Sequence, residues 1–371
     1  MATVNGCTDK QSSAGGVLRS TPISGDEAQS MRGIAILCIV FHNFLHLILP
    51  TFENEFDFSL SRVEVFTDSL TVNPAWALAD VMSFFGWYGV AVFVFLSGYG
   101  LVRKYESRVD GHLSVWPFIK DRWLKVFKLM LVPMLLFAVV WSLCNGKIFP
   151  IDKLLQQLAL IGNIAFPTSV QPGVYWFFGL IFELYVLYRL CIYRRTIGWI
   201  VGLNIFALAL FVGLWLYGDV MLLASVRHNL FGWILPFTLG ALFARYDFAR
   251  MFCNGWVNAI VVIASGILLL AMNYNAYLWY FSPVVAIIAS IALAKLWRGG
   301  VWLGALSSFL FVMHPIVRYI AIRPEVKALF GIGEGSPYTI KLIPLLASYV
   351  ALSILAAYLY RLVHTRLFAR R

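Results

Sequence analysis

Residues 32–50 read RGIAILCIVFHNFLHLILP, an apolar run that one arginine and two histidines interrupt. Ten residues of α-helix rise about 15 Å, roughly half the hydrocarbon thickness of a bilayer. A helix that starts at Arg32 near one membrane face therefore carries His42 near mid-membrane and His46 one turn further on. Ionisable side chains are costly at that depth, so we interpret these histidines as functional candidates.

The composition is that of a membrane protein. Of the 371 residues, 61% are hydrophobic and 13% are charged, and the mean hydropathy is +0.80. Because no soluble domain needs so much apolar surface, we predict an all-α integral membrane protein that crosses the bilayer many times. The five cysteines are scattered along the chain, which favours neither a disulfide framework nor a metal site.

Apolar runs predict a bundle of about ten transmembrane helices. Each run is close to the roughly 20 residues that a helix needs to cross the hydrocarbon layer. The amphipathic stretch 150–164 is short and is expected to lie at the interface or to re-enter the membrane. Residues 1–30 are polar and lack an apolar core, so we expect a flexible cytoplasmic tail rather than a signal peptide. The predicted spans are 33–50, 82–102, 126–144, 174–192, 197–217, 229–244, 257–273, 276–294, 302–321 and 340–362.

The basic residues predict the orientation of the chain. Of the 29 lysines and arginines, 21 fall in alternate segments that share one side of the membrane, and 8 fall on the other side. By the positive-inside rule the richer side is cytoplasmic. Both termini are therefore expected in the cytoplasm and the acidic loop 51–81 outside. The net charge of +11 is mainly an orientation signal and does not indicate a nucleic-acid partner.

The histidines of the first span are candidates for a general base, because the pKa of histidine is near neutrality. Arg32 offers donors suited to phosphate, which favours a phosphate-bearing donor that enters from the cytoplasm. The alternative is an arginine that only orients the chain and a histidine bonded to a neighbouring helix. The spacing of His42 and His46 would also suit a metal ion, but no other ligands converge in the sequence, so no metal is expected.

Two further segments carry ionisable candidates. Glu183 lies in the middle of a predicted span with no adjacent cation, so it must be protonated or paired, with His42 or a tyrosine such as Tyr185 as the expected partner. Arg122 and Lys125 belong to a basic segment at the cytoplasmic face. This segment would hold the phosphates of a donor or contact lipid headgroups.

Three remaining residues are assigned to acceptor binding or to structure. Ser97 lies among small residues that let helices approach closely, and no nucleophile elbow surrounds it, so packing is the simpler interpretation. His314 and Arg318 are one helical turn apart in the span 302–321. Pro315 interrupts the backbone hydrogen bonds next to His314, where a histidine is often structural.

Five segments, taken in order, resemble the acyltransferase-3 family of integral membrane O-acyltransferases. Each segment alone is weakly specific, but the ordered set over residues 30–320 is fairly specific. The family has about ten spans, which agrees with the count above. The five segments are RGIAILCIVFH (32–42), GWYGVAVFVFLSGYGL (86–101), FIKDRWLK (118–125), YWFFGLIFELY (175–185) and LGALSSFLFVMHP (303–315).

The resemblance implies transfer of an acyl group, usually acetyl from acetyl-CoA, to a hydroxyl of an extracytoplasmic glycan or lipid-linked sugar. Acetyl-CoA would be a cosubstrate, no bound cofactor is expected, and residues 31–371 would form the acyltransferase domain in a bacterial inner membrane. By the family pattern, Arg32 and His42 correspond to the first-span arginine and the catalytic histidine. Arg122 and Lys125 correspond to the paired basic residues of the third span.

The sequence departs from the family pattern in two places. Between Arg32 and His42 there is one residue fewer than usual, which leaves them about 80° apart around the helix, whereas His46 is about 40° from the face of Arg32. Either histidine could therefore be the base. Lys125 stands where arginine is more usual and lacks the guanidinium fork. The alternative function is a transporter or flippase for a lipid-linked sugar, which would need no cytoplasmic donor site.

Overall fold

The computed structural model describes residues 23–107, 111–165, 170–218, 220–246, 252, 254–333, 335 and 337–368. The fold is 80% helical, and the described residues contain no strand. The all-α class predicted from the sequence is therefore confirmed. Ten helices make up the body of the bundle: α1 (Gly25–Leu45), α4 (Tyr88–Tyr105), α5 (Val115–Asn145), α8 (Trp176–Leu187), α9 (Ile197–Tyr217), α11 (Ile234–Arg245), α12 (Gly255–Asn273), α14 (Ser282–Leu296), α15 (Val301–Ala321) and α17 (Leu342–Phe368).

Shorter helices lie in the connections between these elements. Single turns of 3-10 or π-helix also occur, at Pro74–Trp76, Gly173–Tyr175, Tyr188–Ile192 and Leu230–Gly232. The short α-helices are α2 (Leu60–Val72), α3 (Ala77–Phe85), α6 (Ile151–Leu158), α7 (Gly162–Ala165), α10 (Val220–Arg227), α13 (Ala276–Trp279) and α16 (Pro324–Leu329).

Helix α1 is at the centre of the bundle. It packs along α15 and α4, α4 packs along α11, and α17 covers α15. In the most apolar part of α1 and of α15, 61% of the residues are buried, against 17% for α9 and α12. The outer helices therefore present their apolar side chains to the lipid, as an all-round hydrophobic helix must.

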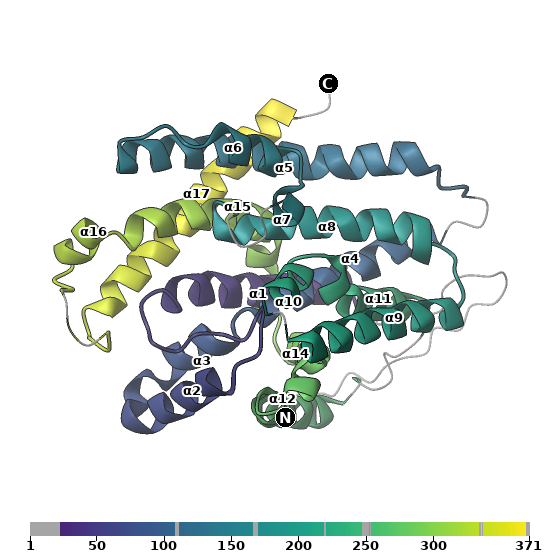
Figure 1. The fold of residues 1–371 in the computed structure, drawn as a ribbon, viewed down its shortest axis with the longest axis horizontal. Helices are drawn as coiled ribbons and strands as arrows, with labels where there is room; N and C mark the ends of the chain where they lie inside the picture. Colours follow the sequence, from purple (N-terminus) through teal and green to yellow (C-terminus); the bar gives the residue numbers. More distant parts are fainter. Residues whose placement is uncertain are drawn as a thin grey trace, which may run out of the picture.

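Figure 1 shows α1, α4, α8 and α9 running across the view, with α2, α3 and α16 toward the left end and the connection from α8 to α9 at the right end. The sequence predicted these two groups of connections on opposite sides of the membrane, and they lie at opposite ends of the bundle.

Among the residues that the structure describes, seven helices are long and apolar enough to cross a membrane, and there are eight if the bent pair Pro74–Phe85 and Tyr88–Tyr105 is one span. The remaining two predicted spans fall on α11 and α14, which have 12 and 15 residues. Both are shorter than the roughly 20 residues that a crossing needs. By helix length and composition the structure therefore has seven or eight spans, fewer than the ten that the sequence predicted.

Helix α1 begins earlier than the sequence predicted. Ser24 and Glu27 form a capping box, in which the Ser24 side chain accepts from the Glu27 N–H and the Glu27 carboxylate accepts from the Ser24 N–H. Such a box satisfies two N–H groups that a helix start leaves unpaired. Glu27 also pairs with Lys295 at 3.0 Å. Residues 25–30 are thus helical, although they were assigned to the flexible tail, and residues 1–22 lie outside the described part.

A helix break at Gly86 brings α3 and α4 against the C-terminal part of α1. The two helices meet at 45°. A side chain at Gly86 would come within 2.6 Å of the Cys38 carbonyl oxygen and of the His42 Cβ. Glycine is therefore required for the close approach, and it places the last turn of α3 beside His42.

Glycines also set the contact between α4 and α11. A Cβ at Gly98 would overlap the carbonyl oxygen of Phe237, and a Cβ at Gly240 would overlap that of Phe95. The packing interpretation of this small-residue face thus holds for Gly98. At Gly100, on the same helix, an added Cβ would meet no other atom within 4 Å.

We predict that Gly98→Ala lowers the melting temperature of the detergent-purified protein, because the added methyl group overpacks the interface with α11 at a cost of about 1–3 kcal/mol. Gly100→Ala is the matched control. It should leave stability unchanged or raise it, since alanine is the better helix former. Equal melting temperatures for the two variants would show that α4 and α11 are not in close contact.

Candidate active site

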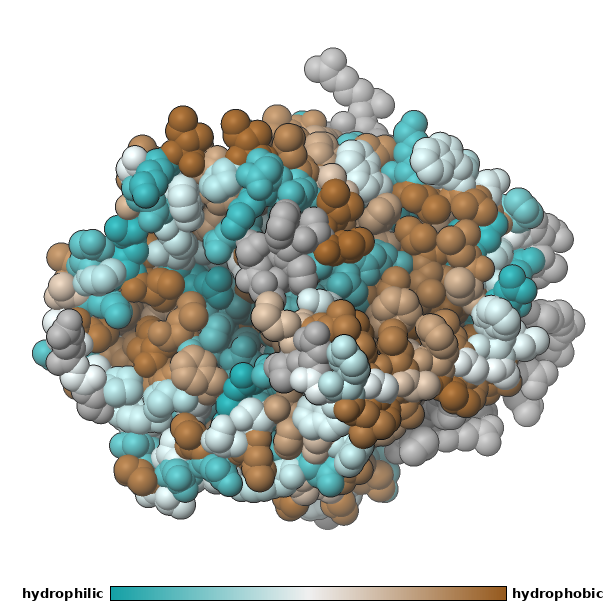
Figure 2. Space-filling view, viewed as in Figure 1, coloured by the Kyte–Doolittle hydropathy of each residue, from teal (hydrophilic) through white to brown (hydrophobic). Residues whose placement is uncertain are grey.

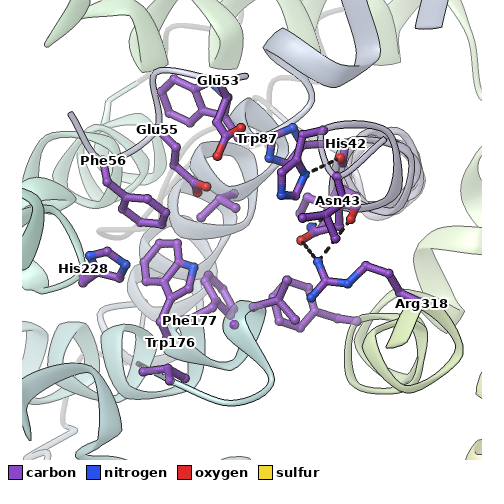
Figure 3. A pocket seen from close by; sticks show the side chains of 18 of the residues that line it. His42, Asn43, Glu53, Glu55, Phe56, Trp87, Trp176, Phe177, His228 and Arg318 are labelled. Atoms are coloured by element: carbon purple, nitrogen blue, oxygen red, sulfur yellow. Dashed lines mark hydrogen bonds between the residues drawn. The ribbon is translucent and has the colours of Figure 1, made fainter. Parts of the chain in front are cut away.

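A cavity of about 480 Å³ lies between α1, α4, α8 and α15, beside the loop that follows α1. Figure 2 shows hydrophobic side chains over much of the visible face and hydrophilic ones in a hollow near its middle. Figure 3 shows the side chains that surround the cavity. The labelled ones are His42, Asn43, Glu53, Glu55, Phe56, Trp87, Trp176, Phe177, His228 and Arg318.

His42 lines the cavity and has a fixed tautomer. Its side chain is buried, and its Nδ1 lies 2.7 Å from the carbonyl oxygen of Ser83 in α3. A carbonyl oxygen can only accept, so Nδ1 carries the proton and Nε2 keeps its lone pair. The Ser83 hydroxyl in turn donates to the Thr51 carbonyl oxygen at 2.7 Å. These contacts orient His42 as a base that can accept a proton at Nε2.

His46 lies beside His42 and has the same tautomer. Its Nδ1 is 2.7 Å from the backbone oxygen of His42, and the two rings stack with centroids 4.7 Å apart. Both histidines line the cavity. The two candidate bases named from the sequence therefore occupy one site, and the geometry gives each a free Nε2.

Glu53 is a site residue that the sequence analysis did not single out. Its carboxylate and one ring nitrogen from each of His42 and His46 lie within 4.8 Å of one another. Burial acts to raise the pKa of Glu53, but the two imidazoles, together with a backbone hydrogen bond and Arg62, hold that pKa below its ordinary value. A carboxylate at this position stabilises an imidazolium, so it supports proton uptake by either histidine.

Side chains from other segments hold the loop that carries Glu53 by hydrogen bonds to its backbone oxygens. Arg227, which is 1% exposed, donates to the Glu55 carbonyl oxygen at 2.9 and 3.2 Å. Trp279 donates its Nε1–H to the Asn54 carbonyl oxygen at 2.7 Å, and Arg62 donates to that of Glu53 at 3.1 Å. Three side chains, two of them from distant parts of the chain, thus fix this loop, which is a form of preorganisation.

Aromatic rings form the opposite wall of the cavity. The rings of Phe56 and His228 stack with centroids 3.8 Å apart, and the Trp176 ring meets both edge-on. Burial lowers the pKa of His228 to about 4, so it stays neutral. Glu55 points into the same space (Figure 3), and burial, together with the neighbouring Glu53 carboxylate, raises its pKa well above the ordinary range. Such a wall can stack a flat or ring-shaped group and bond its hydroxyls.

Arg318 faces this cavity, whereas His314 does not line it. Arg318 Nη1 donates to Asn43 Oδ1 at 2.7 Å and to the Asn43 backbone oxygen at 3.2 Å (Figure 3). His314 is fully buried, and its Nδ1 is 3.0 Å from the Leu310 carbonyl oxygen on its own helix. Of these two residues, the structure thus brings only Arg318 to the cavity.

Glu183 does not contact His42 or Tyr185, which were its expected partners. Its carboxylate accepts from Asn163 Nδ2 at 2.7 Å and from the Leu230 N–H at 2.8 Å. The two hydrogen bonds satisfy a carboxylate that would be costly to bury alone. They also connect α8 to α7, which precedes it, and to the 3-10 turn that precedes α11. The sequence could not name them because Asn163 in α7 and Leu230 in a 3-10 turn are 20 and 47 residues from Glu183 in the chain.

The basic residues form a second cluster near the other end of α1. Arg122 donates to the Tyr105 hydroxyl, and its guanidinium lies 5.7 Å from the centroid of the Tyr185 ring. Arg32 also lies within electrostatic range of Tyr185. Arg122 thus contacts Tyr185, and Arg32 lies close enough to the same tyrosine to interact with it electrostatically, at the end of the bundle that holds the α8–α9 connection.

Lys125 and Ser97 take other positions. Lys125 is half exposed and pairs with Asp121 at 2.6 Å. The Ser97 hydroxyl donates to the Phe93 carbonyl oxygen at 2.8 Å on its own helix. Ser97 also hydrogen-bonds Tyr185. Its hydroxyl is thus engaged beside the basic cluster and not in the cavity.

The fold and the site together define a class: an integral membrane protein whose central helix carries a buried histidine site at one end and a basic cluster at the other. The family comparison agrees with this class. The acyltransferase-3 family, described as an acyltransferase domain, matches residues 27–362. The chain therefore belongs to the acyltransferase-3 family and is a membrane acyltransferase. Neither a curated protein nor a solved structure matches the chain.

Proposed function

We propose that this protein moves an acetyl group from cytoplasmic acetyl-CoA to a hydroxyl of an extracytoplasmic glycan or lipid-linked sugar, in a bacterial inner membrane. The observation that carries the proposal is the fixed tautomer of His42, which leaves Nε2 as a proton acceptor inside the cavity. An acyltransferase needs such a base, because a neutral hydroxyl is a weak nucleophile.

The residues of the cavity have distinct roles in the proposed reaction. His42 Nε2 takes the proton of the acceptor hydroxyl as its oxygen attacks the thioester carbonyl carbon. The Glu53 carboxylate stabilises the imidazolium, which then gives the proton to the departing CoA sulfur. The products are the acetyl ester and free CoA. The aromatic wall of Phe56 and Trp176 suits the faces of a sugar ring, and Glu55, as a neutral acid, can donate to a sugar oxygen.

The basic cluster suits the donor. Arg32 and Arg122 present guanidinium groups near Tyr185, and guanidinium is the group best fitted to phosphate oxygens. Arg32 is ten residues before His42 on one helix, which is about 15 Å of rise. The phosphates of CoA would thus bind at one end of α1 while its thioester extends toward the other.

The proposed orientation follows the charge distribution, with both termini in the cytoplasm. Ten crossings result if the bent pair is one span and if α11 and α14 cross despite their length. The acidic loop then faces outward with Glu53 and Glu55, where its carboxylates would repel CoA phosphates but admit a neutral sugar.

The test of the proposal is acetyl transfer by detergent-purified protein with labelled acetyl-CoA and a glycan acceptor. His42→Ala should lower the rate about 10²–10⁴-fold, the usual contribution of a general base. His46→Ala should lower it less. Both variants must insert into the membrane and elute as folded protein. An inactive His46→Ala beside an active His42→Ala would move the base to His46, and acceptor movement without label transfer would favour a transporter.

We predict that Arg32→Ala and Arg122→Ala raise the KM for acetyl-CoA, because each removes a phosphate contact. High salt should narrow the difference from the unchanged protein. Lys125→Ala should have a smaller effect, since Lys125 is half exposed and paired with Asp121. Lys120→Ala, at an exposed position of the same helix, is the matched control. An unchanged KM in Arg122→Ala would show that Arg122 does not bind the donor and contributes only to the orientation of the chain in the membrane.

We predict that a cysteine placed at Asp68 reacts with a membrane-impermeant maleimide in intact cells and that one placed at Ser107 does not. Both positions are exposed on the protein surface, at opposite sides in the proposed orientation. The Ser107 variant should react once the cells are opened, which controls for its accessibility. The reverse pattern would invert the orientation and exchange the donor and acceptor sides.

A further inference from the structure

The cluster of His42, His46 and Glu53 has the composition of a metal site. Each residue brings one ligand atom, and these three atoms lie within 4.8 Å of one another. His42 lies in the last turn of α1 and His46, four residues on, is the C-cap residue in helical conformation, which places both rings on one face of the helix. Glu53 comes from the following loop, so it is the third ligand that the spacing of the histidines alone could not supply.

The hydrogen bonds of the two rings fit metal binding. A histidine that binds a metal almost always donates its other N–H to a carbonyl or carboxylate oxygen. His42 does so to the Ser83 oxygen and His46 to the His42 oxygen, both at 2.7 Å. The ring orientations and tautomers are therefore set, and both Nε2 lone pairs are available.

One oxygen of the Glu53 carboxylate lacks a hydrogen-bond partner among the described residues. This oxygen, Oε2, is buried. Buried polar atoms are nearly always satisfied, so an unpaired carboxylate oxygen on a residue that lies near two imidazoles favours a cation. Arg318 faces the same cavity, but its guanidinium donates to Asn43 and not to Glu53.

We propose that His42, His46 and Glu53 bind a divalent ion of the Zn²⁺ type, and that this ion blocks the His42 lone pair that acyl transfer uses. Two imidazoles and one carboxylate with an open fourth position form a ligand set that Zn²⁺ accepts. Tetrahedral Zn²⁺ holds its ligand atoms roughly 3.3 Å apart, so binding would draw the three groups closer together. Only the blocking effect rests on the proposed function; ion binding does not.

The binding test uses the full chain, purified in detergent and stripped with a chelator. Calorimetry with Zn²⁺ and visible absorption with Co²⁺ should show an ion bound at this cluster. Glu53→Gln and His46→Gln should each weaken binding by more than about 10-fold, since even the loss of an outer partner costs that much. His228→Gln is the matched control, because His228 also lines the cavity and bonds a backbone oxygen through Nδ1.

A second measurement needs no variant of the cluster. Zn²⁺ should protect His42 and His46 from carbethoxylation, read by peptide mass spectrometry, and should leave His228 as reactive as before. The site is refuted if the unchanged chain binds no ion, if the cluster variants bind as tightly as His228→Gln, or if the two histidines are not protected.

The activity test separates this inference from the proposed function. Saturating Zn²⁺ should abolish acetyl transfer, and a chelator should restore it. Full activity or stimulation at saturating Zn²⁺ would refute the blocking role. If the metal-free chain transfers no acetyl group at all, the proposed function fails, whereas the binding and protection results still decide whether the metal site exists.

Discussion

The hydrogen bond from His42 Nδ1 to the Ser83 carbonyl oxygen is the contact on which the site depends. An imidazole buried inside a membrane bundle has to pair its N–H, and a carbonyl oxygen that has no helical partner is a better acceptor than one already bonded within a regular helix. The break between α3 and α4 solves this problem, because the last turn of α3 has carbonyl groups without helical partners. Gly86 lets that turn approach α1 closely enough for the bond. The helix break, Gly86 and the tautomer of His42 thus depend on one another.

The loop that carries Glu53 and Glu55 is held in a different way: buried side chains donate hydrogen bonds to its backbone oxygens. Arg227 lies between the rings of Trp233 and Trp279, 5.3 and 4.8 Å from their centroids, and bonds the Glu55 carbonyl oxygen. A guanidinium buried without a carboxylate partner is costly, so its carbonyl and ring contacts have to be kept. This loop carries Glu53 and Glu55. Because Arg227 holds the backbone of the loop, it also fixes the acidic side of the cavity.

The sequence predicted the helical class, the family and the first-span histidines, because hydropathy and spacing along one helix are local properties. The assignment of Arg32 and Arg122 to one donor site stays a prediction, although Arg122 lies against the ring of Tyr185. The sequence analysis missed Glu53 as a partner of His42, since that contact depends on how a loop folds back over the end of α1. The expected pairing of Glu183 with His42 was wrong for a similar reason: Asn163 of α7 and the Leu230 N–H of a 3-10 turn donate to the carboxylate instead.

Three phenylalanine rings separate the two ends of the proposed reaction path. Phe177 and Phe311 line the cavity, with ring centroids 5.0 Å apart, and each lies 6.4 Å from the ring of Phe93. Phe93 is one turn from Ser97, which bonds Tyr185 at the basic cluster. Under the proposed function, an acetyl thioester that starts from Arg32 and Arg122 meets these rings before it meets His42. Because a packed ring cluster is close to crystal density, the thioester can pass only if the rings move apart, and water is excluded from the donor while they remain together.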